Sequence, residues 1–470
     1  MITKIKLPAV PQGLAIGAAR SANRLSQKLK RGGGTTIGGL VLNCLRPTAT
    51  SEMSKAISDG IILVSGTNGK TTTARLIRAA LNACDFRVVA NTAGSNLERG
   101  VSNALLDADK ANIALFEVDE AALDGLMVKT KPRVVVLHNL FRDQLDRYGE
   151  LELLVDRWHT AIAQLPTTTT VVYNADDPGI TYIASKHAQT LTYGVDDPRT
   201  DRGGLPHASD STHCRYCDTP LTYDMVTIAH LGRWSCNKCQ RQRPKTDITA
   251  TKVDLHGLAG QRLSAITPQG PTEISLRLPG LHNSYNALAA IACTSALELT
   301  LSDVSTTIAK RRAAFGRAEH IKVSNVRVTT LLAKNPAGAN ENIHTILLDS
   351  NLDLKGHIHL LLLLNNRTAD GRDVSWIWDV DYELLLNCNR LTSLTIGGDR
   401  AYDMALRFRY AGLDTSRIKV LMPIPAAFDA AINSANTHGG LYVLPTYTAL
   451  LELQELLTKR GLTTAFWEDT

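Results

Sequence analysis

The sequence predicts an α/β protein with two units, each a mainly parallel β-sheet covered by helices. Apolar runs of strand length alternate with helix-length segments in both halves of the chain. A glycine-rich turn that ends in Lys70-Thr71 links the first of these runs to a helix. A polar segment with two Cys-x-x-Cys pairs interrupts the first unit. Strands that alternate with helices are typical of parallel sheets, and this pattern therefore sets the expected fold class.

Length and composition agree with a folded protein of several domains. At roughly 100–200 residues per domain, 470 residues exceed one core. With 44% hydrophobic and 20% charged residues, wholesale disorder is excluded. The apolar runs, such as the five leucines Leu360 to Leu364, are far shorter than the roughly 20 residues of a membrane helix. No signal peptide is predicted at the N-terminus, and a cytoplasmic location is expected.

The chain is expected to have three parts. Residues 1–54 form an N-terminal segment with a helix at about 13–30 followed by a loop. Residues 55–314 form the central unit, with a polar insertion at about 200–247 that is expected to lie apart from the core. Residues 315–470 form a second α/β unit, which begins at an expected hinge over 315–319.

The alternation of strands and helices is predicted in detail. In the central unit, strands are expected at 61–65, 87–90, 113–118, 133–137 and 170–173, with a helix at 284–297. In the second unit, strands are expected at 326–332, 358–364, 391–396, 418–421 and 441–444, and helices at about 338–349, 400–411, 424–435 and 446–460.

The turn Gly66-Thr67-Asn68-Gly69-Lys70-Thr71 follows a strand and opens a helix, as a phosphate-binding loop does. Backbone N–H groups and the helix N-terminus would surround the phosphates of a nucleotide. Lys70 would reach the terminal phosphates, and the hydroxyl of Thr71 would bind Mg²⁺. Val64 stands where such loops usually begin with glycine, so an ordinary glycine-rich turn is the alternative.

A magnesium ion needs more oxygen ligands than one threonine supplies. Glu117 closes an apolar strand, and the carboxyl ends of parallel strands face the binding crevice. We therefore predict Glu117 as a second ligand. Asp119 and Glu120 could share or replace it, and a solvated charge at a strand end is the other interpretation.

Four of the eight cysteines form two pairs, Cys214/Cys217 and Cys236/Cys239, with 18 residues between the pairs. This spacing predicts a zinc ribbon with four thiolate ligands, which leaves no position for substrate and indicates a structural role. His207 and His213 are alternative ligands nearby, and a redox or iron–sulfur site is the competing interpretation. The other cysteines, at 44, 84, 293 and 388, are expected to be small buried hydrophobic residues.

Several segments together resemble the Mur ligase superfamily of ATP-dependent amide-forming ligases. They are GTNGKTTT at the phosphate loop, NTAGSNLERGV at 91–101, FEVDE at 116–120, NLFRDQLDRYGE at 139–150, NADDP at 174–178 and HNSYNALAA at 282–290. The cysteine insertion, AKNPAGANE at 333–341 and NNRTADGRDVSWIWDVDYE at 365–383 resemble the branch that amidates lipid II, the membrane-bound peptidoglycan precursor. The resemblance implies a Mur-ligase-type central ATPase domain and a Rossmann-like C-terminal α/β domain.

The resemblance also implies which residues bind ATP. In this family ATP activates a carboxylate as an acyl phosphate, and an amine then attacks it. The implied nucleotide contacts are the loop with Thr72, then Asn174 and Asp177, Asn283 and Asn286, and Arg317 at the hinge.

Two substitutions depart from the pattern of ligases that add amino acids. Gln144 stands where those enzymes have a histidine that helps to bind a second metal, and Arg157-Trp158-His159 stands where they carry a modified lysine. Only the 54 residues of the N-terminal segment precede the central unit, so the usual N-terminal substrate domain is expected to be almost absent. These differences argue against a second metal site and favour ammonia as the nucleophile.

Ammonia must be generated at the site, and glutamine hydrolysis needs a thiolate activated by a histidine. No cysteine of this chain lies on a recognisable strand-to-helix elbow. The resemblance implies a separate GatD-type glutaminase subunit whose Cys–His pair receives an acid from this chain. Asp379, between aromatic residues that suit a protein contact, is the best candidate; Asp373 and Asp381 are its rivals, and all three could be plain surface acids.

The expected function is ATP-dependent amidation of the D-glutamate α-carboxylate of lipid II at the membrane surface, with ATP, Mg²⁺ and Zn²⁺. One alternative is an amino-acid-adding ligase of the folylpolyglutamate type. A more distant one is a nucleic-acid-dependent ATPase, suggested by the basic residues Lys238, Arg241, Arg243 and Lys245. No helicase-type motif accompanies the loop, so no nucleic-acid partner is expected.

Overall fold

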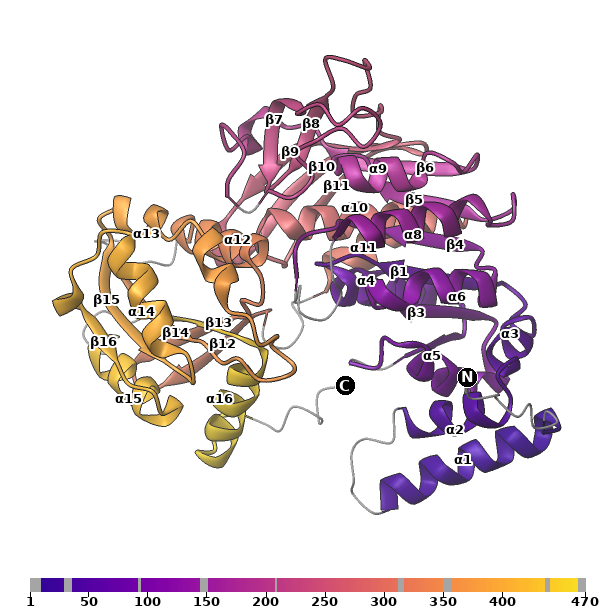
Figure 1. The fold of residues 1–470 in the computed structure, drawn as a ribbon, viewed down its shortest axis with the longest axis horizontal. Coiled ribbons are helices and arrows are strands. Elements are labelled where there is room, and N and C mark those ends of the chain that lie inside the picture. The colour runs from indigo at the N-terminus through magenta and orange to yellow at the C-terminus, as the bar shows by residue number, and fades with distance from the viewer. Residues whose placement is uncertain are drawn as a thin grey trace, which may run out of the picture.

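The computed structural model describes residues 10–28, 36–91, 94–143, 151–207, 209–311, 317–349, 357–435 and 440–463, without the side chains of 317–319. Two α/β units lie side by side in it, the central unit in indigo to salmon and the C-terminal unit in orange to yellow (Figure 1). The predicted fold class is confirmed.

The central unit is built on a nine-stranded sheet. Its strand order is β11-β10-β9-β6-β5-β4-β1-β3-β2, and only β10 runs antiparallel to its neighbours. All five strands that we predicted in this unit are present, and β6 and β9 to β11 are additions. The strands are β1 Ile61–Ser65, β2 Val88–Ala90, β3 Ile113–Glu117, β4 Val134–Leu137, β5 Thr170–Asn174, β6 Thr190–Val195, β9 Ile248–Leu255, β10 Gln261–Thr267 and β11 Gly270–Leu276.

Helices cover both faces of this sheet and form a separate apolar core on each. One core includes α4 (Lys70–Ala83), α10 (Leu281–Ser295) and α11 (Leu301–Ala309). The other includes α5 (Glu98–Leu105), α6 (Leu123–Thr130), α8 (Leu151–Ala163) and α9 (Pro178–Ala184). The strands are therefore buried on both sides, which explains why they read as continuous apolar runs.

The cysteine insertion leaves the sheet between two neighbouring parallel strands, β6 and β9. It contains the hairpin of β7 (Thr222–Ile228) and β8 (Leu231–Ser235). Our interpretation of this segment as lying apart from the core was wrong for the hairpin. Ile228 and Leu231 join the apolar core of the central unit, so the hairpin is packed onto the sheet rather than appended to it.

The C-terminal unit has a six-stranded sheet with the order β12-β13-β17-β14-β15-β16, parallel except for the β12–β13 pair. Its strands are β12 Arg317–Val323, β13 Val326–Leu331, β14 Ile358–Leu363, β15 Leu391–Gly397, β16 Ile418–Val420 and β17 Gly440–Pro445. Its helices are α12 Pro336–Leu347, α13 Glu383–Asn387, α14 Ala401–Tyr410, α15 Ile424–Ala435 and α16 Tyr447–Lys459. We expected a hinge over 315–319. This expectation is corrected in part, because residues from 317 onward belong to strand β12, which pairs with β13. Residues 315 and 316 lie outside the described residues.

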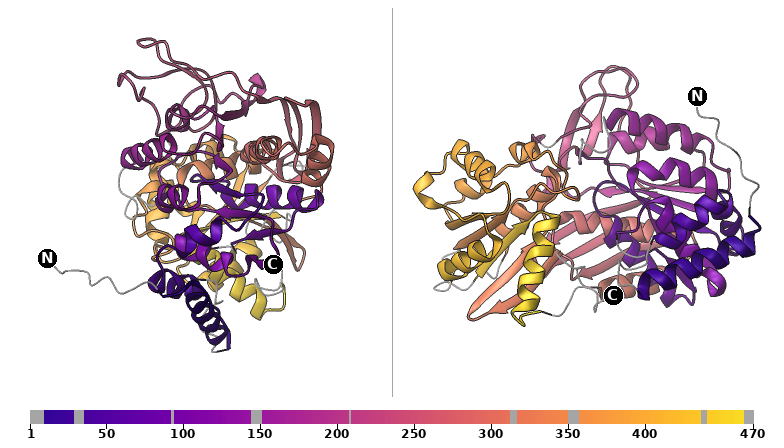
Figure 2. Two further views of the ribbon diagram at one scale, coloured as in Figure 1. Left: turned by 90° about the vertical axis from the view of Figure 1, so that its right-hand side faces the viewer. Right: turned by 60° about the horizontal axis from the view of Figure 1, so that its bottom comes forward.

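The N-terminal part forms three helices, α1 (Gln12–Lys28), α2 (Ile37–Leu45) and α3 (Ala49–Ser54), which pack beside α5 (Figure 1). Figure 2 shows these helices in indigo from two further directions. The predicted first helix is present, but the loop expected after it contains α2 and α3. Gly39 explains this packing, because a Cβ there would lie 1.8 Å from the carbonyl oxygen of Arg99 in α5. Among the described helices, none is both long and apolar enough to span a membrane.

Candidate active site and four-cysteine centre

The predicted phosphate loop connects the end of β1 to the start of α4. Two of its residues must be glycine, since Gly66 and Gly69 have φ angles of 137° and 93°. A Cβ on Gly69 would lie 2.2 Å from the side-chain oxygen of Asn286, and one on Gly66 would lie 2.7 Å from Cβ of His138. The loop is therefore held between α10 on one side and the end of β4 on the other.

Lys70 lies at the first position of α4 with its ammonium group inside the loop. Nζ donates to the carbonyl oxygens of Gly66 (2.5 Å) and Thr67 (3.2 Å) and forms a 3.0 Å ion pair with Glu120. Both side chains of that pair are about nine-tenths buried. Glu120, which we considered as a magnesium ligand, is thus the counter-ion of the lysine. The indole of Trp158 donates to the backbone carbonyl of Glu120 at 3.0 Å, which fixes that residue.

The two predicted magnesium ligands lie together. The hydroxyl of Thr71, in the first turn of α4, donates to Oε1 of Glu117 at the end of β3, at 3.0 Å. Asn91 holds the backbone of Glu117 on both sides, accepting from its N–H (3.0 Å) and donating to its carbonyl (2.8 Å). Asp119, the other alternative, instead accepts from the N–H of Ala121 and caps a short helix. A hydroxyl beside a carboxylate is a ligand set that suits Mg²⁺.

A histidine that the sequence did not single out lies under the loop. His138 is fully buried, with Nε2 2.6 Å from the hydroxyl of Thr73 and Nδ1 3.0 Å from that of Tyr193. Burial, aided by the charge of Lys70, lowers the pKa of His138 to about 3. The ring is therefore neutral at physiological pH and connects α4 to two strands of the sheet.

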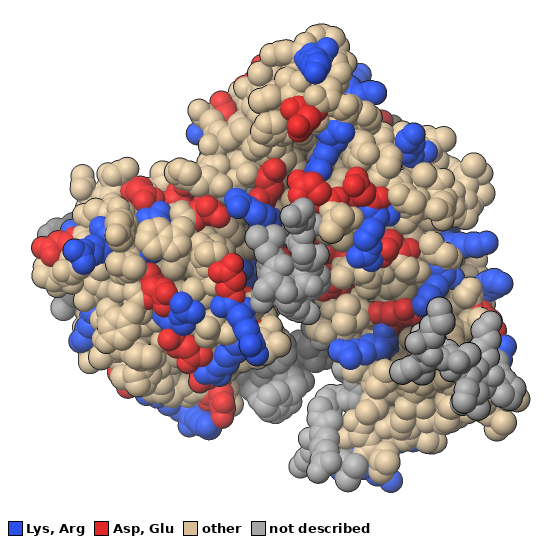
Figure 3. All heavy atoms as spheres, viewed as in Figure 1, with Lys and Arg blue, Asp and Glu red and all other residues tan. Residues whose placement is uncertain are grey.

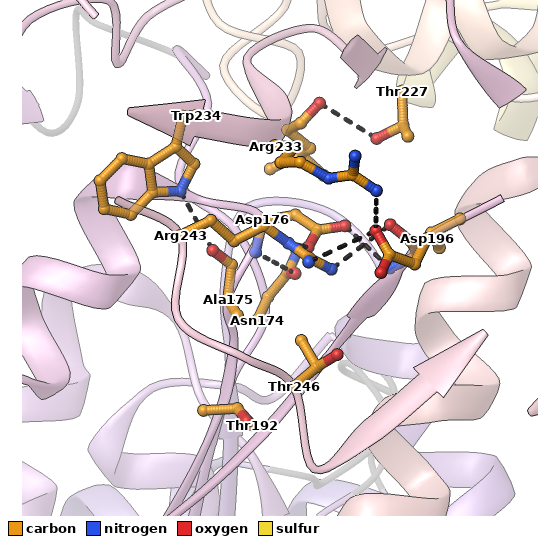
Figure 4. A network of polar contacts seen from close by, with 12 residues as sticks. Asn174, Ala175, Asp176, Thr192, Asp196, Thr227, Arg233, Trp234, Arg243 and Thr246 are labelled. Carbon is orange, nitrogen blue, oxygen red and sulfur yellow. Dashed lines mark hydrogen bonds and ion pairs between the residues drawn. The ribbon is translucent and has the colours of Figure 1, made fainter. Parts of the chain in front are cut away.

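The NADDP segment is buried and holds the insertion in place. Asp177 caps α9, accepting from the N–H groups of Gly179 and Ile180, and Asn174 is fully buried at the end of β5. Asp176, which we did not predict, binds the guanidinium of Arg243 at 2.5 Å. Figure 4 shows this contact, with the indole of Trp234 donating to the carbonyl of Ala175. The structure thus gives Asp176 a structural task, and the nucleotide contacts of Asn174 and Asp177 stay a prediction.

The two predicted asparagines of α10 are in contact. Nδ2 of Asn286 donates to Oδ1 of Asn283 at 2.8 Å, and Nδ2 of Asn283 donates to the carbonyl of Pro279 at 2.6 Å. Asn286 lies against Gly69 of the loop, and its Oδ1 accepts from the hydroxyl of Thr73 in α4 at 3.4 Å. Thr72, the other predicted contact in α4, is buried. The side chain of Arg317 lies outside the described residues.

The C-terminal unit reaches the loop through the two residues before α12. The side-chain amides of Asn335 and Asn68 donate to each other, at 3.0 and 3.3 Å. Lys334 forms a 2.6 Å ion pair with Asp143 and contacts the carbonyl of Thr67 at 3.4 Å. Asp143 begins the segment that departs from the family pattern, and its neighbour Gln144 lies outside the described residues. The loop therefore contacts both units; a contact from the second unit was expected of Arg317, whereas those of Lys334 and Asn335 were not predicted.

The four predicted cysteines converge, with all four sulfurs within 4.8 Å of one another. Sγ of Cys214 lies 3.5 Å from that of Cys239, and Sγ of Cys217 lies 3.4 Å from that of Cys236. Sulfurs around a tetrahedral zinc ion lie roughly 3.8 Å apart, given Zn–S bonds of about 2.3 Å. The cluster fits such an ion and needs neither His207 nor His213.

Both cysteine pairs sit in the same kind of turn. The carbonyl of Cys214 accepts from the N–H of Asp218, and that of Cys236 accepts from Gln240. Asp218 and Gln240 both have a positive φ, 54° and 58°. Two equivalent turns thus bring four thiols to one point, as a structural centre requires.

The three candidate acids of the C-terminal unit differ in how free they are. Asp381 is fixed by Asn340, which donates to its carboxylate at 2.8 Å, and burial raises its pKa. Asp373 is exposed and accepts from the N–H of Ser375. The side chain of Asp379 is about one-third exposed, and Nη2 of Arg142 lies 3.5 Å from its carboxylate. The geometry leaves Asp379 and Asp373 accessible to another molecule and Asp381 occupied.

Two family models match this chain. The Mur ligase middle domain matches residues 64–294, and the MurT ligase C-terminal domain matches residues 332–450. Both ranges agree with the two α/β units.

Two similar proteins cover almost the whole chain. The lipid II isoglutaminyl synthase (glutamine-hydrolyzing) subunit MurT of Streptococcus pneumoniae is 32% identical, over 96% of this chain and 97% of its own length. The protein of the same name from Staphylococcus aureus strain N315 is 27% identical, over 95% and 98%.

Solved structures show the same fold. MurF from Acinetobacter baumannii superimposes with a TM-score of 0.65 at 18% identity, over 90% of this chain and 80% of that one. Folylpolyglutamate synthase of Mycobacterium tuberculosis, solved with ADP, gives 0.60 at 15% identity, over 95% and 99%. From the fold, the family models and the full-length relatives together, we conclude that this chain belongs to the MurT family of Mur ligases.

Proposed function

We propose that this chain is the ATP-dependent subunit of a glutamine-hydrolysing amidotransferase that converts the D-glutamate α-carboxylate of lipid II to the amide. The observation that carries the proposal is the arrangement at the phosphate loop. Lys70 lies within it, the Thr71–Glu117 pair flanks it, and Asn335 of the second unit reaches it. A nucleotide bound there would have its phosphates enclosed between the two units.

The chemistry follows from these groups. An oxygen of the substrate carboxylate attacks the γ-phosphorus of ATP, and the bond from that phosphorus to the bridging oxygen breaks to release ADP. Ammonia then attacks the carbonyl carbon, phosphate leaves, and the nitrogen loses a proton. Lys70, turning from Glu120 to the phosphates, would stabilise the charge that develops on them. A bound Mg²⁺ at Thr71 and Glu117 would neutralise phosphate charge. Contact between the two units would keep water from the acyl phosphate.

A partner protein is a better source of ammonia than this chain itself. The four cysteines outside the cluster all lie in the described part of the chain, and none of them hydrogen-bonds a histidine there. Cys293 is fully buried, and the thiol of Cys388 donates to the carbonyl of Leu385. The two full-length relatives are, by name, subunits of a glutamine-hydrolysing enzyme.

An aromatic surface beside Asp379 suits the glutaminase partner, which we take to be of the GatD type. Tyr402, Leu406 and Tyr410 follow each other at helical spacing along α14 and are 67%, 44% and 73% exposed. Trp378, 44% exposed, meets Tyr410 edge to face at 5.5 Å. Exposed apolar patches of this kind mark protein interfaces, where Trp and Tyr carry much of the binding energy. Asp379 at the edge of this surface would orient the histidine of the partner.

The four-cysteine centre would hold Zn²⁺ in a structural role. The contacts made by the basic residues near this centre favour a structural role over binding of nucleic acid. Arg243 is buried against Asp176, and the guanidinium of Arg241 lies over the ring of Tyr216, 3.7 Å from the centroid. Two of the four basic residues that suggested a nucleic-acid surface are thus engaged within the protein.

Substitution of Asp379 tests the division of labour between the two subunits. The purified complex would be assayed with a lipid II analogue, Mg-ATP and either glutamine or ammonium. With Asp379→Asn, glutamine-dependent amidation should fall by at least tenfold while ammonium-dependent amidation is kept. Asp373→Asn is the matched control and should leave both activities within about twofold. Equal loss of both activities in Asp379→Asn would reject the assigned role.

A further inference from the structure

The first 51 residues have an unusual charge for this protein. They contain no Asp or Glu, and their basic residues are Lys4, Lys6, Arg20, Arg24, Lys28, Lys30, Arg31 and Arg46. Because the whole chain has a net charge of +6, residues 52–470 together carry −2. The positive charge of the protein is thus concentrated in one segment, which attracts an anionic surface.

The described helices of this segment expose their large apolar residues and bury their small ones. Ala15 and Ala19 are the fully buried residues of α1, whereas Leu14 and Leu25 are 67% and 59% exposed. Leu14, Ala18 and Leu25 follow at i, i+4 and i+11, so they share one side of the helix. A helix whose only role is to pack against the protein would place its leucines inward.

The neighbouring helix α2 continues the exposed apolar surface. Ile37 and Leu40 are 41% and 48% exposed, and Cys44, at the same helical spacing, is exposed rather than buried as we expected. α1 and α2 pack against each other along their length. In Figure 3, the surface over these two helices at the lower right is tan with scattered blue spheres.

Polar contacts fix the inner side of both helices to the central unit. Oδ1 of Asn103 in α5 accepts from Nδ2 of Asn23 at 2.9 Å and from the N–H of Gly39 at 3.1 Å. Arg20 donates to the carbonyl of Leu106 and pairs with Asp109 at 2.7 Å. These bonds hold α1 and α2 in one orientation, so the outer side is presented as a fixed surface.

Two basic residues border the apolar stripe without facing the protein. Arg24 and Lys28 are both exposed. They lie one and two helical turns beyond Arg20, which pairs with Asp109. Leucines flanked by Arg and Lys on a helix that lies flat are typical of helices bound at a membrane surface. Nucleic acid would use the basic residues but would gain nothing from Leu14 and Leu25.

We propose that the outer side of α1 and α2, formed by Leu14, Leu25, Ile37, Leu40, Arg24 and Lys28, docks on the surface of an anionic lipid bilayer. The choice of a bilayer rests on the proposed function, whose substrate is anchored in one. Docking would hold the active site at the membrane, where the peptide of the substrate emerges. The leucines would enter the boundary between head groups and acyl chains, and the basic residues would pair with lipid phosphates.

Binding to vesicles tests this surface directly. The full chain, in complex with its partner, would be sedimented with vesicles of phosphatidylcholine alone or mixed with phosphatidylglycerol. We expect binding to the anionic vesicles that weakens as salt is raised. Arg24→Gln/Lys28→Gln should weaken it roughly 25-fold, at about fivefold per basic residue. Leu14→Ser/Leu25→Ser should weaken it about tenfold or more. All four side chains are exposed, so the melting temperature should not change.

The control is a matched charge pair at the other edge of the central sheet. Arg262→Gln/Arg277→Gln removes two exposed basic residues from β10 and the turn after β11 and should change vesicle binding by less than twofold. Equal effects of the control and test pairs, equal binding to neutral vesicles, or no binding would overturn the proposal. So would a dimer that Leu14→Ser/Leu25→Ser dissociates, or DNA binding that only the charge variant loses.

A second readout separates this inference from the proposed function. With a water-soluble stem-peptide substrate that lacks the lipid, both variants should amidate as fast as the unaltered complex, and they should be slower only with substrate in vesicles. If no substrate is amidated at all, the proposed function fails, while vesicle binding still tests the surface.

Discussion

At the scale of single residues, the site depends on groups that are held in place before any ligand binds. Glu117 is positioned by Asn91 through two backbone hydrogen bonds and already contacts Thr71. Lys70 is neutralised by Glu120 and enclosed in the loop. Because a buried charge is costly without a partner, Glu120 serves as the counter-ion of the lysine until phosphates replace it.

Glu117→Gln should separate the charge of this side chain from its shape. The amide oxygen can still accept from Thr71, so the fold is kept, but the affinity for Mg²⁺ falls with the lost charge. We expect ADP formation to fall by tenfold or more and to recover in part at high Mg²⁺. Glu273→Gln, an exposed change on the outermost strand β11, serves as the control. A magnesium dependence identical to that of the unaltered protein would remove Glu117 from the site.

His138 should make the protein sensitive to acid. Its pKa is about 3 in the folded chain and about 6.5 when unfolded, so below pH 6.5 the unfolded state binds more protons. The contribution of His138 to stability is fully present above pH 6.5. It is lost as the pH falls towards 3, and the free energy of unfolding then decreases by roughly 1.4 kcal/mol per pH unit at most. In His138→Gln this slope should flatten, as measured by urea unfolding between pH 7 and 4.

His344 provides the comparison for this experiment. Burial also lowers its pKa to about 3, but it lies on α12, at the small pocket between Arg202 and Leu255. His344→Gln should flatten the pH dependence of stability as His138→Gln does. Only His138→Gln should also impair ATP binding. If neither variant changes the pH dependence, the histidines are not the source of the acid sensitivity.

At the scale of elements, the cysteine insertion should stabilise the protein without touching the chemistry. Cys236→Ser removes one of four ligands, so the purified protein should lose bound zinc and melt several degrees lower. ADP affinity should stay within about threefold, because the insertion residues that contact the NADDP segment, among them His230, Gly232, Trp234 and Arg243, are not the four ligands. Cys388→Ser is the matched control. Full stability after removal of the metal by a chelator would contradict a structural role.

The sequence predicted elements better than it predicted contacts. Strands β1 to β5 and β13 to β17 were predicted because buried parallel strands are continuous apolar runs. Strands β9 to β11 form an antiparallel edge with an exposed side, and their weaker alternating pattern, as in the burial of β10, gave less signal. α2 was missed because Gly38 and Gly39 suggested a loop, whereas they are there to let α2 approach α5.

The same difference applies to the site. The residues of the phosphate loop and the four cysteines lie in short sequence motifs, and Glu117 closes a predicted strand. Their grouping could therefore be predicted from the sequence. His138, Asp176 and the Asn68–Asn335 pair become significant only when distant segments meet. No local spacing signals such contacts; the one hint was the AKNPAGANE segment that contains Asn335.

At the scale of the whole molecule, Asn335 connects the C-terminal unit to the phosphate loop. Its side chain also caps α12 by accepting from the N–H of Gly338 at 2.9 Å. Asn335→Asp keeps a cap but breaks one bond of the amide pair and puts a negative charge beside the phosphates. Asn335→Ala removes both the cap and the amide pair, and loss of the cap costs about 1 kcal/mol of stability. We expect both variants to lower kcat/KM for ATP, and only the alanine variant to lose stability.

Gly440 offers a control for changes in the C-terminal unit that do not reach the interface. A Cβ there would meet no atom within 4 Å, so Gly440→Ala should be neutral. If Asn335→Asp has full activity, contact between the two units is not needed for turnover.

The central claim is that this phosphate loop passes a phosphoryl group to a carboxylate before ammonia enters. Transfer of ¹⁸O tests it most directly. A lipid II analogue whose D-glutamate α-carboxylate carries ¹⁸O would be turned over by the complex with Mg-ATP and glutamine. We predict one ¹⁸O in each phosphate released, one ADP for each amide formed, and neither with Lys70→Met. Amide formation with unlabelled phosphate, or without ADP, would contradict the account.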